Sequence, residues 1–177
     1  MTQSPDRAGP LNSAKSIAAA GLMASVALIF SYIEVLIPFN FGVPGVKLGI
    51  ANLVIIVALY YLNGKYALVI NAVRIFIAGF LFSGVFGIIY SLAGGMLSLA
   101  VMVLLKRTDL FSATGISIAG GVMHNLGQII VASILVGNIR VFVYFPVLVI
   151  SGVVSGFLIG ILSFLILRRL PRINAAQ

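Results

Sequence analysis

The sequence predicts an all-α membrane protein, a bundle of six transmembrane helices. Of its 177 residues, 62% are hydrophobic and only 8% are charged. A soluble domain carries roughly 25% charged residues, so this composition excludes a soluble protein. The hydrophobic residues also form six long runs, separated by short segments rich in Gly, Pro, Asn or Lys. Composition and spacing therefore indicate the same fold class.

Each apolar run is expected to form one membrane helix. The runs are Ile17–Ile37, Leu48–Leu62, Tyr66–Phe82, Val85–Leu105, Ile116–Val136 and Phe145–Leu167. The second run is short for a span, which takes ~20 residues, so we expect it to be little tilted, shielded by its neighbours or extended by the preceding Gly/Pro segment. Turn residues such as Ser83-Gly84 separate the runs. No cleavage site follows the first run, which predicts a membrane helix instead of a removed signal peptide.

Basic residues predict the orientation, because cytoplasmic loops of membrane proteins are enriched in Lys and Arg. With the N-terminus inside, only Lys47 and Arg140 fall in outer loops, and Arg74 lies within a helix. The other eight cations are then cytoplasmic. We expect one domain over residues 17–169, with cytoplasmic tails at residues 1–16 and 170–177. The net charge of +8 then reflects topology and contact with membrane lipid, not a nucleic-acid partner. These features predict a multi-pass protein of a cell membrane, the bacterial inner (cytoplasmic) membrane.

A polar island, His124-Asn125-Leu126-Gly127-Gln128, interrupts the fifth run. His124 and Gln128 are four residues apart and share one helix face. Polar side chains are costly in hydrocarbon and persist where they line a cavity or bond to a neighbouring helix. We expect a ligand-binding wall here; an interhelical hydrogen bond is the alternative.

Asn71 and Arg74 form a second polar face on the third run. Arg74 lies about 12 Å above the inner boundary, the same depth as His124. Its guanidinium must meet a ligand, a carboxylate or backbone carbonyls. Glu34 lies ~13 Å higher, so pairing with Arg74 is not expected. Glu34 itself is either a proton or cation site or an interfacial carboxylate that reaches water.

The polar residues occupy the middle and outer half of the predicted bundle, which indicates a pocket open to the outside and closed below. The candidate substrate-binding residues are His124, Asn125, Gln128, Arg74, Asn71, Asn52, Tyr90, Lys47, Glu34 and Arg140. Asn52 and Tyr90 are expected at its mouth. Because only Glu34 is acidic among them, we expect an anionic solute.

Small residues recur at every fourth position in two helices, which allows close helix packing. In the last run these are Gly152, Gly156 and Gly160. In the first run they are Ser16, Ala20 and Ala24, near its cytoplasmic end. We expect both stripes to pack within the molecule, and the second could also dock a membrane partner.

Catalysis, metal binding and a bound cofactor are not expected. The chain has no cysteine, one histidine and three acidic residues. A magnesium-dependent diphosphate enzyme needs clustered carboxylates to hold its ions, and these are missing. The sequence also has no phosphate-binding loop of the ATPase type. Active transport would therefore draw energy from a partner or an ion gradient.

Several strings resemble the Gx transporter family, often labelled heptaprenyl diphosphate synthase component I. They are Pro44-Gly45-Val46-Lys47-Leu48-Gly49-Ile50-Ala51-Asn52-Leu53-Val54, Arg74 at mid-helix, Tyr90-Ser91-Leu92-Ala93-Gly94-Gly95, the His124 island and Tyr144-Phe145-Pro146. The resemblance covers about residues 17–169. Members look like the S components of energy-coupling-factor transporters, which are six-helix proteins that bind a vitamin-like solute. The resemblance implies a separate energy-coupling membrane subunit and a pair of ATPases as partners. Ala20 and Ala24 match the partner motif of S components loosely.

We therefore expect the membrane-embedded, substrate-binding component of a small-solute uptake transporter. Two alternatives stay open at this point. One is an accessory membrane subunit linked to isoprenoid, quinone or flavin electron-transfer metabolism. The other is a component of heptaprenyl diphosphate synthesis, which the family label names.

Overall fold

The computed structural model describes residues 10–36 and 49–170, with side chains from residue 14 onward. Over these residues all the regular elements are helical. The α-helices are α1 (Pro10–Leu36), α2 (Ile50–Tyr61), α3 (Gly64–Ala78), α4 (Gly84–Arg107), α5 (Ala113–Val136) and α6 (Phe145–Arg169). A π-helical turn η1 (Gly79–Ser83) precedes α4, and a 3-10 helix η2 (Ile139–Tyr144) precedes α6. The all-α class is thus confirmed for the described residues.

Among the described residues, four helical segments are long and apolar enough to cross a membrane, judged by length and composition. They are Ala14–Leu36, Gly64–Arg107, Ala113–Val136 and Ile139–Arg169. These segments support the prediction of a multi-pass membrane protein. That the chain crosses the membrane six times, and that both termini are cytoplasmic, remain predictions.

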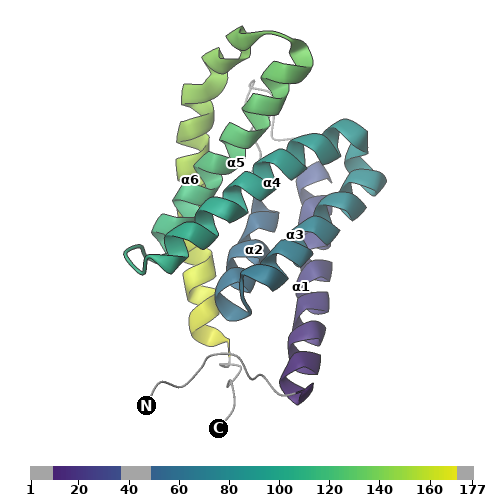
Figure 1. Ribbon diagram of the computed structural model, residues 1–177, viewed down its shortest axis with the longest axis vertical. Helices are drawn as coiled ribbons and strands as arrows, with labels where there is room; N and C mark the ends of the chain where they lie inside the picture. The colour runs from purple at the N-terminus through teal and green to yellow at the C-terminus, as the bar shows by residue number, and fades with distance from the viewer. Residues whose placement is uncertain (1–9, 37–48, 171–177) are drawn as a thin grey trace.

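The segment Gly64–Arg107 folds back on itself to form the hairpin of α3 and α4 (Figure 1). A loop is expected at Ser83-Gly84, but η1 leads directly into α4. The reversal needs a single residue because Gly84 has a φ of 68°, in the left-handed region that favours glycine. This explains why one continuous helical segment stands where two apolar runs are predicted.

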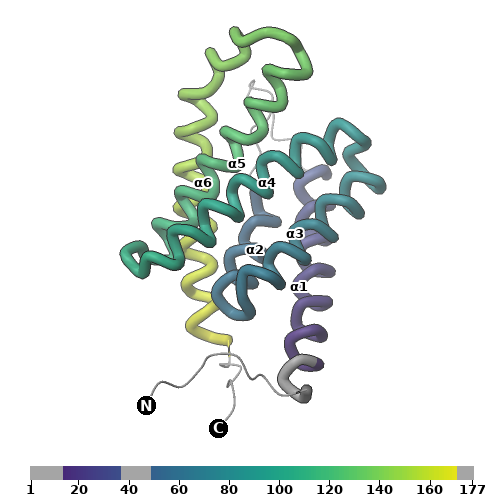
Figure 2. The backbone as a smooth tube through the Cα atoms, in the orientation of Figure 1, coloured from purple at the N-terminus to yellow at the C-terminus, as the bar shows by residue number. Residues whose placement is uncertain are grey.

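The helices alternate in direction along the chain. In Figure 2, α1, α3 and α5 run from the lower end upward, and α2, α4 and α6 run downward. The start of α1, the α2–α3 turn, the α4–α5 turn and the end of α6 therefore lie toward the lower end. Helix caps mark two of these turns: Asn63 accepts a hydrogen bond from the Tyr66 N–H, and Ser112 from the Gly115 N–H.

The short helix α2 lies at the centre of the molecule, between α1 and α6 (Figure 1). Its residues from Leu53 to Leu59 are all buried. A helix that is apolar on every side is stable only when neighbours enclose it, and α1, α3 and α6 all contact α2. The expectation that neighbours shield the short second run is confirmed.

Glycines bring α5 into backbone contact with α6. A Cβ atom added at Gly156 would lie 2.7 Å from the Cα of Ile118, and one at Gly152 would lie 2.9 Å from the backbone N of Val122. Atoms cannot approach that closely, so only glycine allows this spacing. The predicted packing role of the stripe in α6 is confirmed.

The stripe on α1 also faces the interior. Ala20 and Ala24 pack against the apolar core around α2, and Ser16 is half-buried. Intramolecular packing therefore accounts for these alanines. Docking of a membrane partner on this stripe stays a prediction.

Candidate functional site

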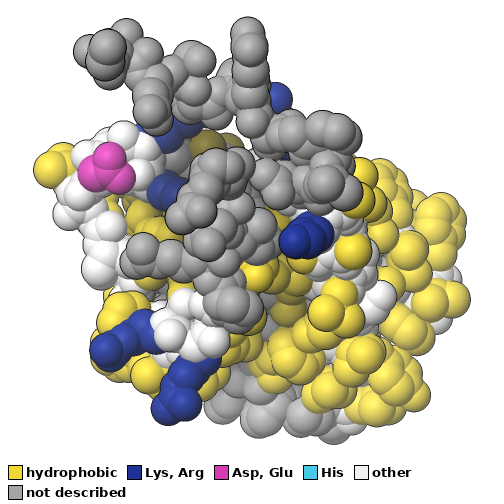
Figure 3. Space-filling model, turned by 90° about the horizontal axis from the view of Figure 1, so that it is seen from below, with side chains coloured by type: hydrophobic (Ala, Val, Ile, Leu, Met, Phe, Trp, Pro, Cys, Tyr) yellow, Lys and Arg dark blue, Asp and Glu magenta, His cyan; other side chains and the backbone are white. Residues whose placement is uncertain are grey.

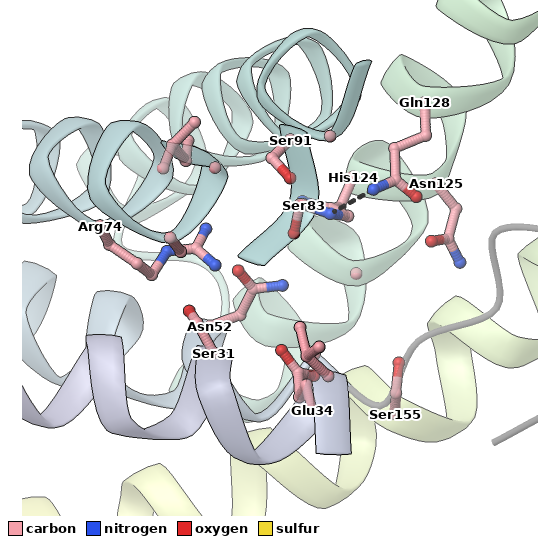
Figure 4. A pocket seen from close by; sticks show the side chains of 17 residues that line it. Ser31, Glu34, Asn52, Arg74, Ser83, Ser91, His124, Asn125, Gln128 and Ser155 are labelled. Atoms are coloured by element: carbon pink, nitrogen blue, oxygen red, sulfur yellow. Dashed lines mark hydrogen bonds between the residues drawn. The ribbon is translucent and has the colours of Figure 1, made fainter. Parts of the chain in front are cut away.

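A polar cavity of about 140 Å³ lies among the helices, with residues from all six α-helices in its wall. Its labelled polar lining in Figure 4 consists of Ser31, Glu34, Asn52, Arg74, Ser83, Ser91, His124, Asn125, Gln128 and Ser155. Six of the ten predicted substrate-binding residues are thus brought together. Because α1 contributes its last residues and α2 its first, the cavity lies toward the upper end of Figure 1.

One wall of the cavity is the polar face of α5. The Nε2 atom of His124 lies 3.1 Å from the Nε2 atom of Gln128, as their spacing predicts. Space for the imidazole comes from α4, because a Cβ atom at Gly94 would lie 3.1 Å from Cε1 of His124. The two side chains therefore present a joined pair of polar groups to the cavity, held by close packing of α4 on α5.

Asn125 fits both interpretations of the polar island, a ligand-binding wall and an interhelical hydrogen bond. It lines the cavity, but its Nδ2 donates a 2.7 Å hydrogen bond to the backbone carbonyl of Leu148 in α6. This is the interhelical bond given above as the alternative to ligand binding. Neighbouring residues on one helix thus have different roles, with His124 and Gln128 toward the cavity and Asn125 toward α6.

The opposite side of the cavity contains Arg74, which is only 8% exposed. Its Nη2 donates a 2.8 Å hydrogen bond to Oδ1 of Asn71. Its Nε is buried and has no hydrogen-bond partner among the described residues. A buried polar N–H without a partner costs about 1–3 kcal/mol, more for a charged group. Arg74 therefore places a guanidinium, which forms no ion pair with any described residue, in the wall of a polar cavity, although its Nε atom itself is covered by protein.

Asn71 does not line the cavity, although the sequence places it among the candidate residues. It is 1% exposed and packs beside α4, where a Cβ atom at Gly95 would lie 2.9 Å from its Nδ2. Its carbonyl oxygen accepts the bond from Arg74. Asn71 thus holds the guanidinium from behind, which makes it a positioning residue.

Glu34 links α1 to the start of α2. Its Oε1 accepts a 2.8 Å hydrogen bond from the backbone N–H of Ile50. That N–H belongs to the first turn of α2 and has no partner within the helix, and the helix dipole favours a negative charge there. Glu34 and Arg74 line the same cavity, but the described residues contain no ion pair between them. Figure 4 shows Ser31 and Asn52 in the space between the two groups.

The remaining candidates lie elsewhere. Tyr90 does not line the cavity, whereas its neighbour Ser91 does. Arg140 is exposed in η2, with its backbone N–H bonded to the Asn138 side chain. Lys47 lies outside the described residues.

Sequence reasoning missed four serines of the lining: Ser31, Ser83, Ser91 and Ser155. Serine is common in membrane helices and often bonds to its own helix, as Ser31 does to the carbonyl of Ala27 at 2.9 Å. Only Ser91 had a usable signal, because it falls inside one of the strings that carry the family resemblance.

Comparison with known families matches residues 23–166 to the family described as heptaprenyl diphosphate synthase component I. The match covers well over half of the chain and confirms the family resemblance. The likeness to S components of energy-coupling-factor transporters stays a prediction. No curated protein and no solved structure matches the chain.

Proposed function

The chain belongs to the heptaprenyl diphosphate synthase component I family, and we propose that it is the membrane-embedded, substrate-binding component of a small-solute uptake transporter. The polar cavity is the proposed binding site. The solute is a small anion, with a carboxylate or phosphate group. Energy comes from partner subunits, a membrane coupling protein and cytoplasmic ATPases, as the resemblance to S components implies.

The proposal rests on the burial, the position and the hydrogen bonding of Arg74. It is buried, it lines a polar cavity, and its Nε has no partner among the described residues. Guanidinium groups bind carboxylate and phosphate through two parallel N–H donors, and such charge-assisted bonds are strong in surroundings of low dielectric constant. An anionic solute in the cavity would neutralise the buried charge of this guanidinium.

Hydrogen-bonding groups on the other walls would select among anions. His124 and Gln128 on α5, Asn52 on α2 and the cavity serines offer both donors and acceptors. Glu34 is oriented by the start of α2 and adds one negative charge. A solute with a polar or cationic group away from its anionic end fits this arrangement better than a simple inorganic anion.

Cavity size limits the solute. A closed cavity of about 150 Å³ holds one benzene molecule, and this one measures about 140 Å³. The fit is therefore to a solute of roughly one small ring, or to a larger one after the helices separate.

The test uses the full-length chain purified in detergent. Mass spectrometry of the released small molecules identifies a solute, whose affinity is then measured by calorimetry. The Arg74→Gln variant is expected to bind it about 10- to 100-fold more weakly, the range for one charged hydrogen bond. Arg140→Gln removes an exposed arginine and is the matched control, with affinity unchanged. Equal affinity in wild type and Arg74→Gln would contradict the proposal.

The family's printed name favours a second candidate, a component of heptaprenyl diphosphate synthesis. Among residues 10–36 and 49–170, no group of three or more His, Cys, Asp or Glu side chains could hold a metal ion. A cavity of about 140 Å³ is also far smaller than a heptaprenyl chain. A magnesium-dependent synthase assay on the purified chain separates the two, because product formation would favour the second candidate.

A further inference from the structure

A second hollow lies between α3 and α4, with a volume of about 920 Å³. Its lining comes from the end of α2, the turn into α3, the start of α3, the second half of α4 and Asp109 just after α4. In Figure 1, α3 and α4 meet at η1 and diverge away from it, so this groove occupies the open end of the hairpin. No residue is shared with the polar cavity.

The groove has an apolar part and a basic end. On α4, Met96, Ala100 and Leu104 follow each other at four-residue spacing and lie on one face. Met96 is 41% and Leu104 60% exposed. Arg107 ends this stripe, and Lys65 occupies the same position at the start of α3. From Met96 to Arg107 the helix rises about 16 Å, close to half of the ~30 Å hydrocarbon core of a bilayer. The stripe therefore has the length of one membrane leaflet.

Positive charge predominates at the end of the groove. Lys65 and Arg107 are exposed, and neither forms an ion pair in the described part of the chain. Lys106 is fixed in place: its Nζ donates a 2.6 Å hydrogen bond to the carbonyl of Leu59 and lies 4.8 Å from the ring centroid of Tyr60. Asp109 is the one acidic residue in the lining. Three cations against one carboxylate favour an anionic ligand.

Figure 3 shows the lower end of the molecule, where Lys and Arg side chains border a broad hydrophobic surface. Along the groove, Lys65 and Arg107 lie at the start of α3 and the end of α4, and the apolar stripe of α4 extends away from them, so a ligand meets charge at one end and apolar side chains beyond it. A free anion would use only the first of these. An anionic phospholipid would use both.

We propose that this groove binds one anionic phospholipid, with its phosphate between Lys65 and Arg107 and an acyl chain along Met96, Ala100 and Leu104. Basic side chains near a membrane surface attract anionic headgroups, and the apolar stripe adds contact with the chain. The lipid would fill the open end of the α3–α4 hairpin. The site is independent of solute binding in the polar cavity.

The first experiment is native mass spectrometry of the full-length protein with phosphatidylglycerol or phosphatidylcholine of identical acyl chains. Wild type is expected to retain phosphatidylglycerol preferentially. The double variant Lys65→Gln/Arg107→Gln should weaken this preference about tenfold or more. Arg168→Gln/Arg169→Gln, which removes two cations at the end of α6 outside the groove, should leave it unchanged. Equal loss in both double variants would overturn the proposal, because the preference would then come from overall charge.

The second experiment tests the acyl chain. Ala100→Phe fills the apolar stripe without changing a charge and should lower phosphatidylglycerol retention. Ala18→Phe, at an exposed alanine of α1, is the control. Inorganic phosphate at the lipid concentration should not displace the lipid. Retention unchanged by Ala100→Phe, or displacement by phosphate, would show a headgroup site alone and overturn the proposed acyl contact.

Discussion

Two helical hairpins of this protein, α3–α4 and α5–α6, differ in how tightly they close. In the α5–α6 hairpin, glycines at 121, 152, 156 and 160 bring the backbones into contact over much of the shared length. In the α3–α4 hairpin the helices meet near η1 and leave a groove of about 920 Å³ toward the other end. Both pairs are strongly apolar. The positions of small residues, not overall hydrophobicity, therefore determine where the helices pack in backbone contact and where they leave space for a ligand.

The cavity and the groove extend this contrast. The cavity collects polar groups from all six α-helices, and close packing of Gly94 on His124 holds one of its walls in place. The groove is built from three helices and opens at the surface. A polar cavity among the helices suits a small polar solute, whereas an open amphipathic groove at the surface suits a lipid.

The largest expected effect concerns the sealed hairpin. Gly156→Leu would push a side chain into the backbone of Ile118 and Ser117 in α5. We expect destabilisation at the upper end of the roughly 1–3 kcal/mol typical of overpacking, seen as a lower thermal unfolding temperature in detergent. Gly21→Leu on α1, where a Cβ atom has no neighbour within 4 Å, is the matched control and should be near neutral. Similar losses in both variants would contradict the contrast between sealed and open faces.

The next prediction separates stability from binding on adjacent residues of α5. Asn125→Ala removes the hydrogen bond to the carbonyl of Leu148 and should cost about 1–2 kcal/mol of stability, with a smaller loss of solute affinity than His124→Ala, because its Nδ2 is already used in that bond. His124→Ala should weaken solute binding without unfolding the protein. Thermal unfolding and calorimetry on both variants check this. Lost stability with unchanged affinity in His124→Ala would assign that residue to packing instead.

The smallest effect is expected where α1 meets α2. Glu34→Gln keeps a hydrogen-bond acceptor for the Ile50 N–H but removes the charge at the start of α2. The loss should be about 0.3–1 kcal/mol, the value of a charge at a helix terminus. Glu34→Leu removes both and should cost more. If the two variants lose stability equally, the hydrogen bond contributes nothing and only the charge stabilises this junction; if Glu34→Gln loses nothing, the charge contributes nothing.

The sequence predicts the helical class because apolar runs and a membrane solvent leave few alternatives. Spacing within one helix also predicts local pairs: Asn71 with Arg74 and His124 with Gln128 are in contact as expected. The turn residues Ser83-Gly84 predict the break between α3 and α4, and the positive φ of Gly84 makes it, but the π-helical turn η1 just before it has no signal in the sequence.

Contacts between helices are harder to predict, because they depend on rotation and tilt. A shift of one residue turns a side chain by ~100° around the helix, which is the difference between Tyr90 and Ser91. The sequence places Glu34 and Arg74 at different depths in the membrane, yet both side chains line one cavity. Asn71 illustrates a further limit: its position beside Arg74 was predictable, but its place behind the cavity wall depends on how α4 packs at Gly95.

The central claim is that an anionic solute binds in the polar cavity beside the buried guanidinium of Arg74. An experimental structure of the full-length chain, purified in lipid nanodiscs with its co-purifying solute, tests this most directly. We predict a small ligand whose anionic group accepts a hydrogen bond from the Arg74 guanidinium, with His124 or Gln128 in contact on the opposite wall. A cavity that contains only water while the identified solute is bound at another place would contradict the account.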